Sequence, residues 1–150
     1  MKHRRGFGLL VFLFMLVFAA CSRDGSTASG STSSASASSG PGNVQVTLSE
    51  YKVESSTTTF TAGTRYHFVV TNSGQAAHEF MVMQPMNMGN MPMDQMDKMA
   101  LAHITNINPG QTQTIDYTFP SSSATQSLEF SCHLSGHYEQ GMKLPIKVNK

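Results

Sequence analysis

The sequence predicts an all-β domain over residues 43–150, built as an antiparallel sandwich of short strands. The first observation is that apolar and polar residues alternate in several short stretches, as in strands that bury one face. The second is that glycine and proline turn signals separate these stretches. The third is their content of Thr, Val and Ser, which disfavours helices. The 108 residues of this segment are enough for a single sandwich core.

Five stretches carry the alternation, and each is expected to form a strand. Two of them follow the turn signals Ala62–Gly63 and Pro109–Gly110. The alternating apolar residues are Val44, Val46 and Leu48, then Tyr66, Phe68 and Val70, then Ile115, Tyr117 and Phe119, then Leu128, Phe130 and Cys132, and finally Ile146 and Val148.

Residues 84–103 interrupt the pattern, because this methionine-rich stretch shows no strand period. Pro92 is a favourable first residue for a helix, and Asp94 and Asp97 would lie in its early turns, near the positive end of the helix dipole. The sequence therefore predicts a short helix or loop insertion in the sandwich, with the helix running from Pro92 to about Ala102.

Residues 1–20 have the features of a secretory signal peptide. Three basic residues, Lys2, Arg4 and Arg5, precede an apolar run of 14 residues from Phe7 to Ala20. The run is shorter than the roughly 20 residues of a membrane-spanning helix. It ends in small residues, as before a cleavage site. An uncleaved membrane anchor is the alternative interpretation.

A cysteine follows the apolar run directly. Residues 18–21, Phe-Ala-Ala-Cys, resemble the lipobox of bacterial lipoproteins, which implies that Cys21 becomes the lipidated first residue of the mature chain. Cleavage without lipidation is the alternative. Residues 22–42 contain nine Ser and four Gly among 21 positions, so residues 21–42 are expected to be a lipidated Cys and a flexible linker. The expected location is exported and lipid-anchored to the cell membrane or outer membrane, facing the periplasm or the extracellular space.

The charge of the chain argues against a nucleic-acid partner. The formal net charge is +1, and it becomes −2 once the three positive charges of the leader are removed. The rest of the chain contains no basic block. We therefore expect a membrane contact through the lipid anchor and protein partners, and no nucleic acid.

The two cysteines, Cys21 and Cys132, give the first indication of chemistry. If Cys21 is acylated, Cys132 has no partner for an intramolecular disulfide. A lone thiol is unusual in an exported domain, because that compartment favours oxidation. Cys132 is therefore an inert buried residue, a reactive nucleophile or a metal thiolate, and its neighbours decide between these.

The residues after Cys132 favour the metal. His137 and Met142 follow it in the pattern Cys-x4-His-x4-Met, and Gly136 and Gly141 offer the two turns that return the chain to one point. A thiolate, imidazoles and a distant thioether are the ligands of a copper ion that shuttles between two oxidation states. Zinc in the same ligands is the main competing interpretation.

One imidazole is missing from this set, and a distant strand is expected to supply it. His78 follows the turn at residues 72–74, and Phe80 and Val82 would share its face of the strand. The predicted metal ligands are therefore His78, Cys132, His137 and Met142.

These residues resemble the cupredoxin (blue-copper) family, and in particular small exported bacterial cupredoxin-like lipoproteins. The likeness covers residues 43–150 and rests on the sequences HEF at 78–80 and CHLSGHYEQGM at 132–142. The spacing between Cys and His is closer to the rusticyanin and auracyanin branch than to plastocyanin. The resemblance implies a Greek-key β-sandwich that holds one type 1 copper ion. Glu79 departs from the pattern, because azurin- and plastocyanin-like sites often have Asn after the first His.

His133, next to Cys132, raises the question of an enzyme. Multicopper oxidases and copper nitrite reductases resemble this loop, but Ser131 precedes the Cys here, and the chain has no His-x-His pair for a trinuclear cluster. A binuclear electron-transfer centre would need a second bridging Cys. A nucleophilic Cys132–His137 pair would leave Met142 unexplained. We expect a protein that is not an enzyme, with His133 beside the ligands rather than among them.

Methionine is concentrated in one stretch. From Met81 to Met99, eight of 19 residues are Met, against 11 in the whole chain. Met81 and Met83 are expected to belong to a strand. Thioethers select Cu(I), which makes the remaining six a candidate auxiliary Cu(I) site: Met86, Met88, Met91, Met93, Met96 and Met99. A hydrophobic lid or docking surface is the alternative, because Met is an adaptable filler.

Two functions follow as hypotheses. In the first, the protein is a membrane-tethered one-electron carrier that serves redox protein partners. In the second, it binds copper for homeostasis, resistance or delivery, serves copper-handling proteins and uses the Met-rich segment for Cu(I). The complete four-ligand site favours the first hypothesis.

Overall fold

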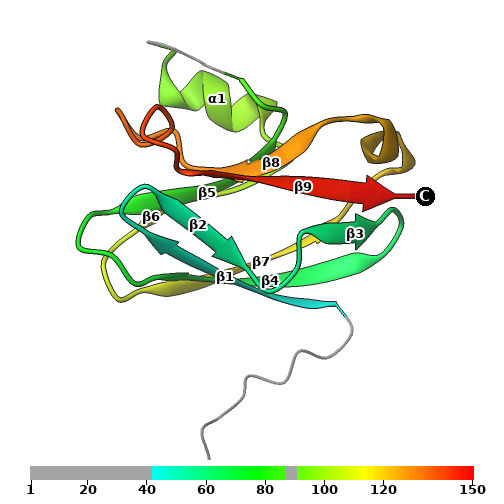
Figure 1. The fold of residues 1–150 in the computed structure, drawn as a ribbon, viewed down its shortest axis with the longest axis horizontal. Coiled ribbons are helices and arrows are strands. Elements are labelled where there is room, and N and C mark those ends of the chain that lie inside the picture. Colours follow the sequence, from blue (N-terminus) through cyan, green and yellow to red (C-terminus); the bar gives the residue numbers. More distant parts are fainter. Residues whose placement is uncertain (1–41, 87–90) are drawn as a thin grey trace, which may run out of the picture. The chain divides into compact units, whose positions relative to one another are not determined.

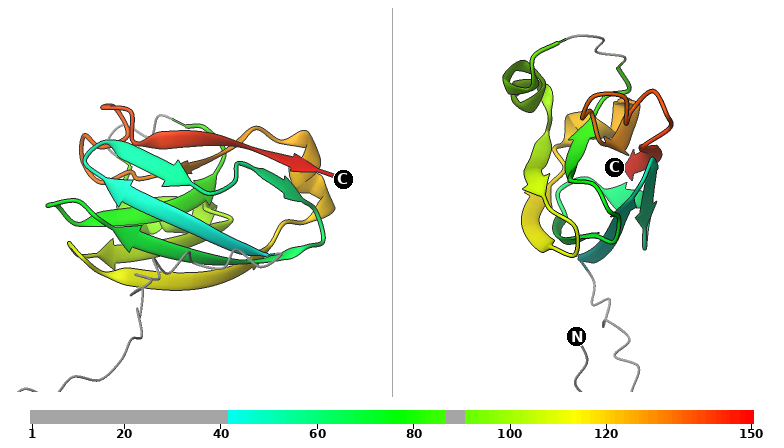
Figure 2. Two further views of the ribbon diagram at one scale, coloured as in Figure 1. Left: turned by 60° about the horizontal axis from the view of Figure 1, so that its bottom comes forward. Right: turned by 90° about the vertical axis from the view of Figure 1, so that its left-hand side faces the viewer.

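The computed structural model describes residues 42–86 and 91–150, which form two packed β-sheets (Figures 1 and 2). The first sheet has the order β2-β1-β4-β7 and the second the order β3-β9-β8-β5-β6. The first sheet consists of β1 (Asn43–Ser49), β2 (Lys52–Ser55), β4 (Arg65–Asn72) and β7 (Thr112–Thr118). The second consists of β3 (Thr59–Thr61), β5 (His78–Met83), β6 (Ala102–Ile107), β8 (Leu128–Ser131) and β9 (Lys143–Asn149). The predicted β-sandwich is confirmed.

Several predictions concern segments outside the described residues. These are the signal peptide of residues 1–20, the lipidation of Cys21, the linker up to residue 41, and Met88. Within the described ranges, no helix is long and apolar enough to cross a membrane.

Two of the strand pairs are parallel, a detail that alternation alone does not show. β1 pairs with β4 and β3 pairs with β9 in parallel, and the remaining pairs are antiparallel. The chain crosses to the second sheet between β2 and β3 and returns between β3 and β4. For this reason β4 arrives beside β1 in the same direction. Crossings of this kind are the connections of a Greek-key sandwich.

Aromatic side chains from both sheets fill the sandwich interior. Their ring centroids lie 5.0–5.9 Å apart, and each ring is at most 1% exposed. Cys132 and Met142 belong to the same cluster of buried residues. Burial of each aromatic contributes about 1.5–3 kcal/mol, so this core fixes two of the three predicted ligands of the loop at residues 132–142. The five aromatic residues are Phe60, Phe68, Phe80, Phe119 and Phe130.

The alternation in the sequence corresponds to burial in the strands. Val44, Val46 and Leu48 of β1 are at most 1% exposed. Ile115 and Tyr117 of β7 are only half-buried, because β7 is the edge strand of the first sheet. Phe119 follows the end of β7, and the short 3-10 helix η1 (Ser121–Thr125) then leads to β8.

A third layer covers the outer face of the second sheet. It contains α1 (Met93–Met99), which Figure 2 shows on the side of that sheet away from the first. The helix begins after Pro92 as predicted, but it ends at Met99 rather than near Ala102. The reason is that Leu101 N–H already donates to the Val82 carbonyl (2.8 Å), and Ala102 starts β6.

Candidate metal centre

Three of the predicted ligands converge at one end of the sandwich. His78 Nδ1 lies 3.3 Å from His137 Nδ1, and Cys132 Sγ lies 3.4 Å from His137 Nδ1. All three donor atoms lie within 4.8 Å of one another. Donors about 2.0–2.3 Å from one ion in a trigonal plane would be roughly 3.5–4 Å apart. The arrangement therefore fits a single metal ion.

The backbone of residues 132–142 brings the C-terminal ligands together. Cys132 N–H donates to the Met142 carbonyl (3.1 Å), and Met142 N–H donates to the His137 carbonyl (3.0 Å). Gly136 and Gly141 have φ values of 80° and 101°, in the left-handed region that favours glycine. They form the two turns that the sequence predicted. Met142 is completely buried, and its part as the fourth ligand stays a prediction.

Two polar side chains hold the loop before His78. Asn72 is completely buried, and its amide nitrogen donates to the carbonyls of Ala76 and of the last residue of β6, both at 2.8 Å. Glu50, in the turn after β1, accepts hydrogen bonds from the N–H groups of Gln75 and Ala76. These bonds lower the pKa of Glu50, and the bond from Gln75 has the largest effect. These hydrogen bonds fix the loop, and they therefore also fix the position of His78 at its end.

Burial controls the protonation of the donors. It raises the pKa of the Cys132 thiol to about 11, although the N–H groups of Glu79 and Leu134 bond to the sulfur and act in the opposite direction. Burial is the main cause that lowers the pKa of His78, and the charge of His137 lowers it further. His78 is therefore a neutral imidazole that can donate a lone pair. A metal ion that binds Cys132 must displace the thiol proton.

Glu79 fastens the ligand loop to β5. Its Oε1 accepts a hydrogen bond of 2.6 Å from His133 N–H, and the side chain is 1% exposed. Burial raises the pKa of Glu79 to about 7, while the bond from His133 acts in the opposite direction. The residue that departs from the family pattern thus connects the strand of His78 to the loop of Cys132.

His133 lies beside the donor group and is not part of it, as predicted. Its ring stacks on Tyr138, with the centroids 4.3 Å apart and the planes 16° apart. Its Nε2 lies 3.1 Å from Ser131 Oγ. Burial lowers the pKa of His133. Its side chain therefore packs the ligand loop against β8.

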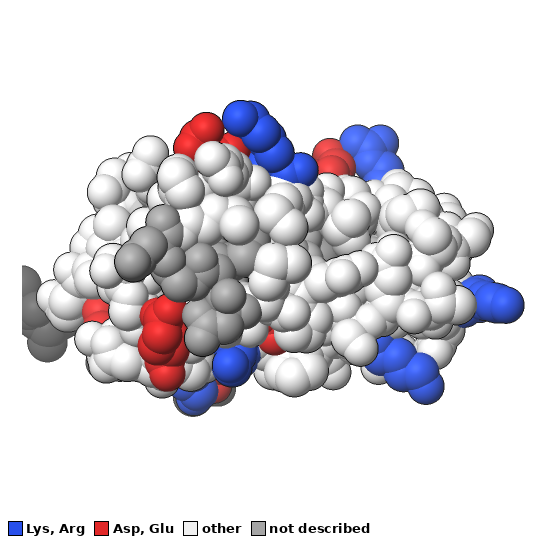
Figure 3. Space-filling model, turned by 90° about the horizontal axis from the view of Figure 1, so that it is seen from above, with Lys and Arg blue, Asp and Glu red and all other residues white. Residues whose placement is uncertain are grey.

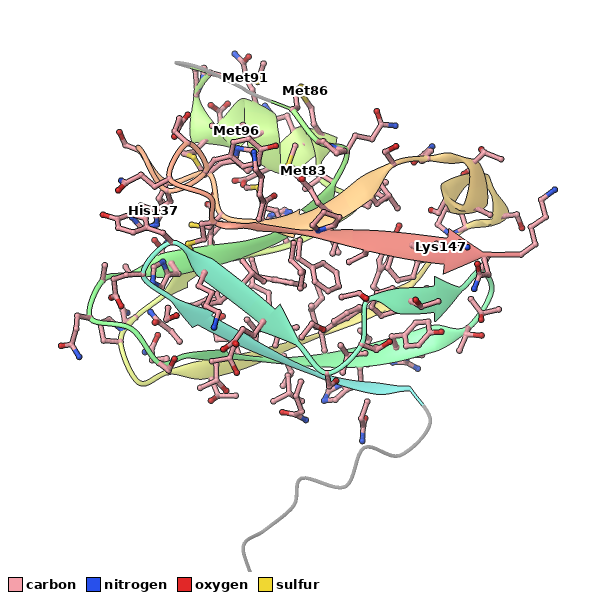
Figure 4. All side chains as sticks on the ribbon, viewed as in Figure 1. Met83, Met86, Met91, Met96, His137 and Lys147 are labelled. Carbon is pink, nitrogen blue, oxygen red and sulfur yellow. The ribbon has the colours of Figure 1, made fainter. Side chains whose placement is uncertain are left out.

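His137 is the ligand nearest to solvent. Its side chain is half-buried, whereas Cys132 and His78 are buried. Tyr51 meets its ring edge-on at a centroid distance of 5.7 Å, and Tyr51 is 43% exposed. Figure 4 places His137 at the end of the sandwich. One ligand thus lies close to the surface, next to an exposed aromatic ring.

The structure also brings most of the predicted auxiliary residues together. Met96 forms a buried cluster with the two methionines of β5, and Met86, Met91 and Met93 pack against this cluster, whereas Met99 is 45% exposed. No charged side chain dominates the surface above this layer, where Figure 3 shows acidic and basic groups scattered over a mostly uncharged face.

Sequence reasoning did not identify Asn72, Glu50 or Glu79 as supports of the site. Glu79 carries a usable signal, because it is a charged residue within a run of apolar strand residues and is buried only with a partner. Asn72 is the last residue of β4 and Glu50 lies in the turn after β1, and polar residues are expected at strand ends and in turns in any case.

The sandwich topology and the donor group together define a cupredoxin-type domain. The trigonal set of two imidazoles and one thiolate is the set that suits one type 1 copper ion.

Solved structures with the same fold include two auracyanins and an azurin. Dithionite-reduced auracyanin from the photosynthetic bacterium Roseiflexus castenholzii gives a TM-score of 0.55 at 18% identity, over 73% of this chain and 98% of that chain. Auracyanin B gives 0.56 at 17%, over 72% and 88%. The azurin Az-iso2 from the methylotroph Methylomonas sp. strain J gives 0.58 at 14%, over 74% and 100%. No family model and no curated protein matches the sequence.

Proposed function

We propose that the protein is a membrane-tethered one-electron carrier with a single type 1 copper ion. The observation that carries the proposal is the convergence of His78, Cys132 and His137 on one point. Met142, buried in the same cluster as Cys132, is proposed as the weaker fourth ligand. When bound there, a copper ion supplies exchange between Cu(II) and Cu(I).

The surroundings of the donors keep them in place, as a carrier requires. The ligand loop closes on itself through the Cys132–Met142 backbone bond, and Glu79 fastens it to β5. Two N–H groups directed at the sulfur stabilise the charge of a thiolate. Donors held in this way need little rearrangement when the charge of the site changes.

His137 is the proposed point of electron entry and exit. It is the most exposed of the three ligands, and the exposed Tyr51 extends the surface around it. A redox protein that docks there would need only a small and short-lived interface, which suits rapid exchange.

A carrier is a better proposal than an enzyme that uses Cys132 as a nucleophile. The thiol is completely buried, and burial raises its pKa to about 11. Reactive cysteines have the opposite properties, namely a lowered pKa and partial exposure.

The test is a titration of the full chain with Cu(II), followed by visible absorption and paramagnetic resonance, and then by voltammetry. We expect an intense thiolate-to-copper band that saturates at one equivalent, and a reversible one-electron wave. A colourless protein would overturn the copper site. A coloured protein without a reversible wave would overturn the carrier function. Zinc, the control ion, should bind without colour.

The tether has a separate test. Cys21→Ala should move the protein from the membrane fraction to the soluble fraction of the producing cells, because it removes the proposed lipid attachment. An unchanged distribution would contradict lipidation at Cys21 and would leave the copper site unaffected.

Copper handling is the second candidate function, and one observation favours it. Met86, Met91, Met93 and Met96 gather with Met81 and Met83 in one layer over the second sheet.

A further inference from the structure

The outer face of the second sheet carries a cluster of methionines that the electron-carrier proposal does not use. Figure 4 shows several of them between α1 and the strands beneath it. Three members are buried and three more pack against them. The buried residues are Met81, Met83 and Met96, and the partly buried ones are Met86, Met91 and Met93.

The composition of this cluster differs from what apolar packing alone requires. Among the described residues, the sandwich core has 19 buried members, and Met142 is its one methionine. In the outer cluster every buried residue is Met. Leu can replace Met in packing at little cost, whereas Met near the surface of an exported domain is open to oxidation. The thioether sulfur is therefore the property that distinguishes this layer.

Two methionines of this cluster line a cavity together with Met99, which lies outside the cluster. Met83, Met86 and Met99 line a space of about 300 Å³. Gln84, Leu101 and Gln126 complete its lining. Met99 is 45% exposed, so an ion can enter from solvent without unfolding of the layer.

A buried carboxyl group lies beside Met83, one of the residues that line this cavity. Glu129 on β8 is the cross-strand partner of Met83 on β5, which puts both side chains on the same face of the sheet. Glu129 is 3% exposed, and Tyr138 bonds its carboxyl group. Its Oε1 has no hydrogen-bond partner among the described residues. A buried acceptor without a partner is costly, and a cation nearby would lower that cost.

We propose that Met83, Met86 and Met99 bind one Cu(I) ion in this cavity, with the Glu129 carboxylate balancing its charge. Thioethers are soft ligands that select Cu(I) over zinc and over hard cations. Binding involves no change of oxidation state, and the ion enters and leaves as Cu(I). The protein would thus hold two copper ions, one in fixed donors at the end of the sandwich and one in adaptable donors on its outer face.

The test counts Cu(I) bound by the full chain, with a chromophoric Cu(I) chelator as competitor under anaerobic conditions. We expect two equivalents for the native sequence and one for the triple variant Met83→Leu, Met86→Leu, Met99→Leu. The matched control, Met91→Leu with Met93→Leu, changes methionines of the same layer that do not line the cavity, and it should still bind two. Glu129→Gln should keep two equivalents but weaken the second several-fold, because it removes the balancing charge.

A second measurement does not depend on the folding of the variants. In the native chain with 13C-labelled methionine methyl groups, the resonances of Met83, Met86 and Met99 should move on addition of the second equivalent. Binding of one equivalent by the native sequence, two by the triple variant, or shifts confined to other methionines would overturn the proposal. The thiolate band reports on the first site separately, so failure here leaves the electron-carrier proposal in place.

Discussion

The two buried clusters of this domain are built from different side chains. Branched and aromatic residues fill the sandwich, where they pack in fixed rotamers and hold Cys132 and Met142 in place. Methionine, which is unbranched and adapts to irregular spaces, fills the layer under α1. The donor group, which must stay rigid, thus lies against the stiff cluster. A site that must take up and release an ion suits the adaptable one.

The largest expected effect is the loss of the visible band, which should occur without any change in Cu(I) binding by the methionine layer. Cys132→Ser should abolish the intense visible band of the copper-loaded protein, because it removes the thiolate. Binding of Cu(I) by the methionine layer should be unchanged, since no thioether is altered. Absorption and Cu(I) competition measured on the same sample check both results. Retained colour would show that the thiolate is wrongly assigned.

A second prediction compares the two clusters by stability. Phe68→Ala should lower the free energy of unfolding by about 3–5 kcal/mol, because it opens a cavity in the stiff core. Met96→Leu, at a buried position of the outer layer, should cost less than about 1.5 kcal/mol. Urea unfolding of the metal-free variants measures both values. Equal losses would remove the distinction between the clusters.

A third prediction concerns Glu79, whose side chain lies on the outer face of β5 but bonds the ligand loop. Glu79→Ala should cost about 1–3 kcal/mol, because it leaves the buried His133 N–H without a partner. Glu79→Gln retains an acceptor oxygen and should recover most of the loss, which makes it the matched control. Thermal unfolding of both variants gives the comparison. A Glu79→Gln variant as unstable as Glu79→Ala would mean that the hydrogen bond is not the cause.

The smallest expected effect tests whether the helix holds the methionine layer. Lys98 Nζ lies 3.4 Å from Asp94 Oδ2 on the exposed side of α1. Lys98→Ala should cost only about 0.3–0.5 kcal/mol, with faster amide exchange confined to α1. Lys52→Ala, which breaks the exposed Lys52–Glu54 pair of β2, is the control and should leave exchange in α1 unchanged. Faster exchange throughout β5 in the Lys98 variant would show that the layer depends on this ion pair.

The predicted metal ligands could be identified from the sequence, whereas the residues that hold them in place could not. Cys132, His137 and Met142 lie within one loop, where spacing and glycine turns restrict the geometry. His78 could be assigned because the set lacked one imidazole. The partner of Glu79 lies 54 residues away and one of the two partners of Asn72 lies 35 residues away, and only the folded topology brings such partners together.

The strands β2, β3 and β6 were not predicted from the sequence, and each omission has a physical reason. β2 and β3 contain four and three residues, and each buries a single apolar side chain, Val53 or Phe60, so no alternation can be seen. In β6, Asn106 adopts a φ of 55°, which places Ile107 rather than its neighbour toward the core. β5 has both faces buried, so its run of apolar residues gave no indication that Met81 and Met83 lie under a helix.

The distance along the chain between the ligands has a further consequence. His78 and His137 are 59 residues apart, and an ion held between them joins β5 to the loop before β9. Such an ion is a cross-link that restricts the unfolded chain, as a disulfide of the same span would. It also stabilises by mass action, because the unfolded chain does not assemble the donors. Unlike a disulfide, this cross-link opens to a chelator and not to a reductant. The resistance of the domain to proteases should therefore rise and fall with the copper supply.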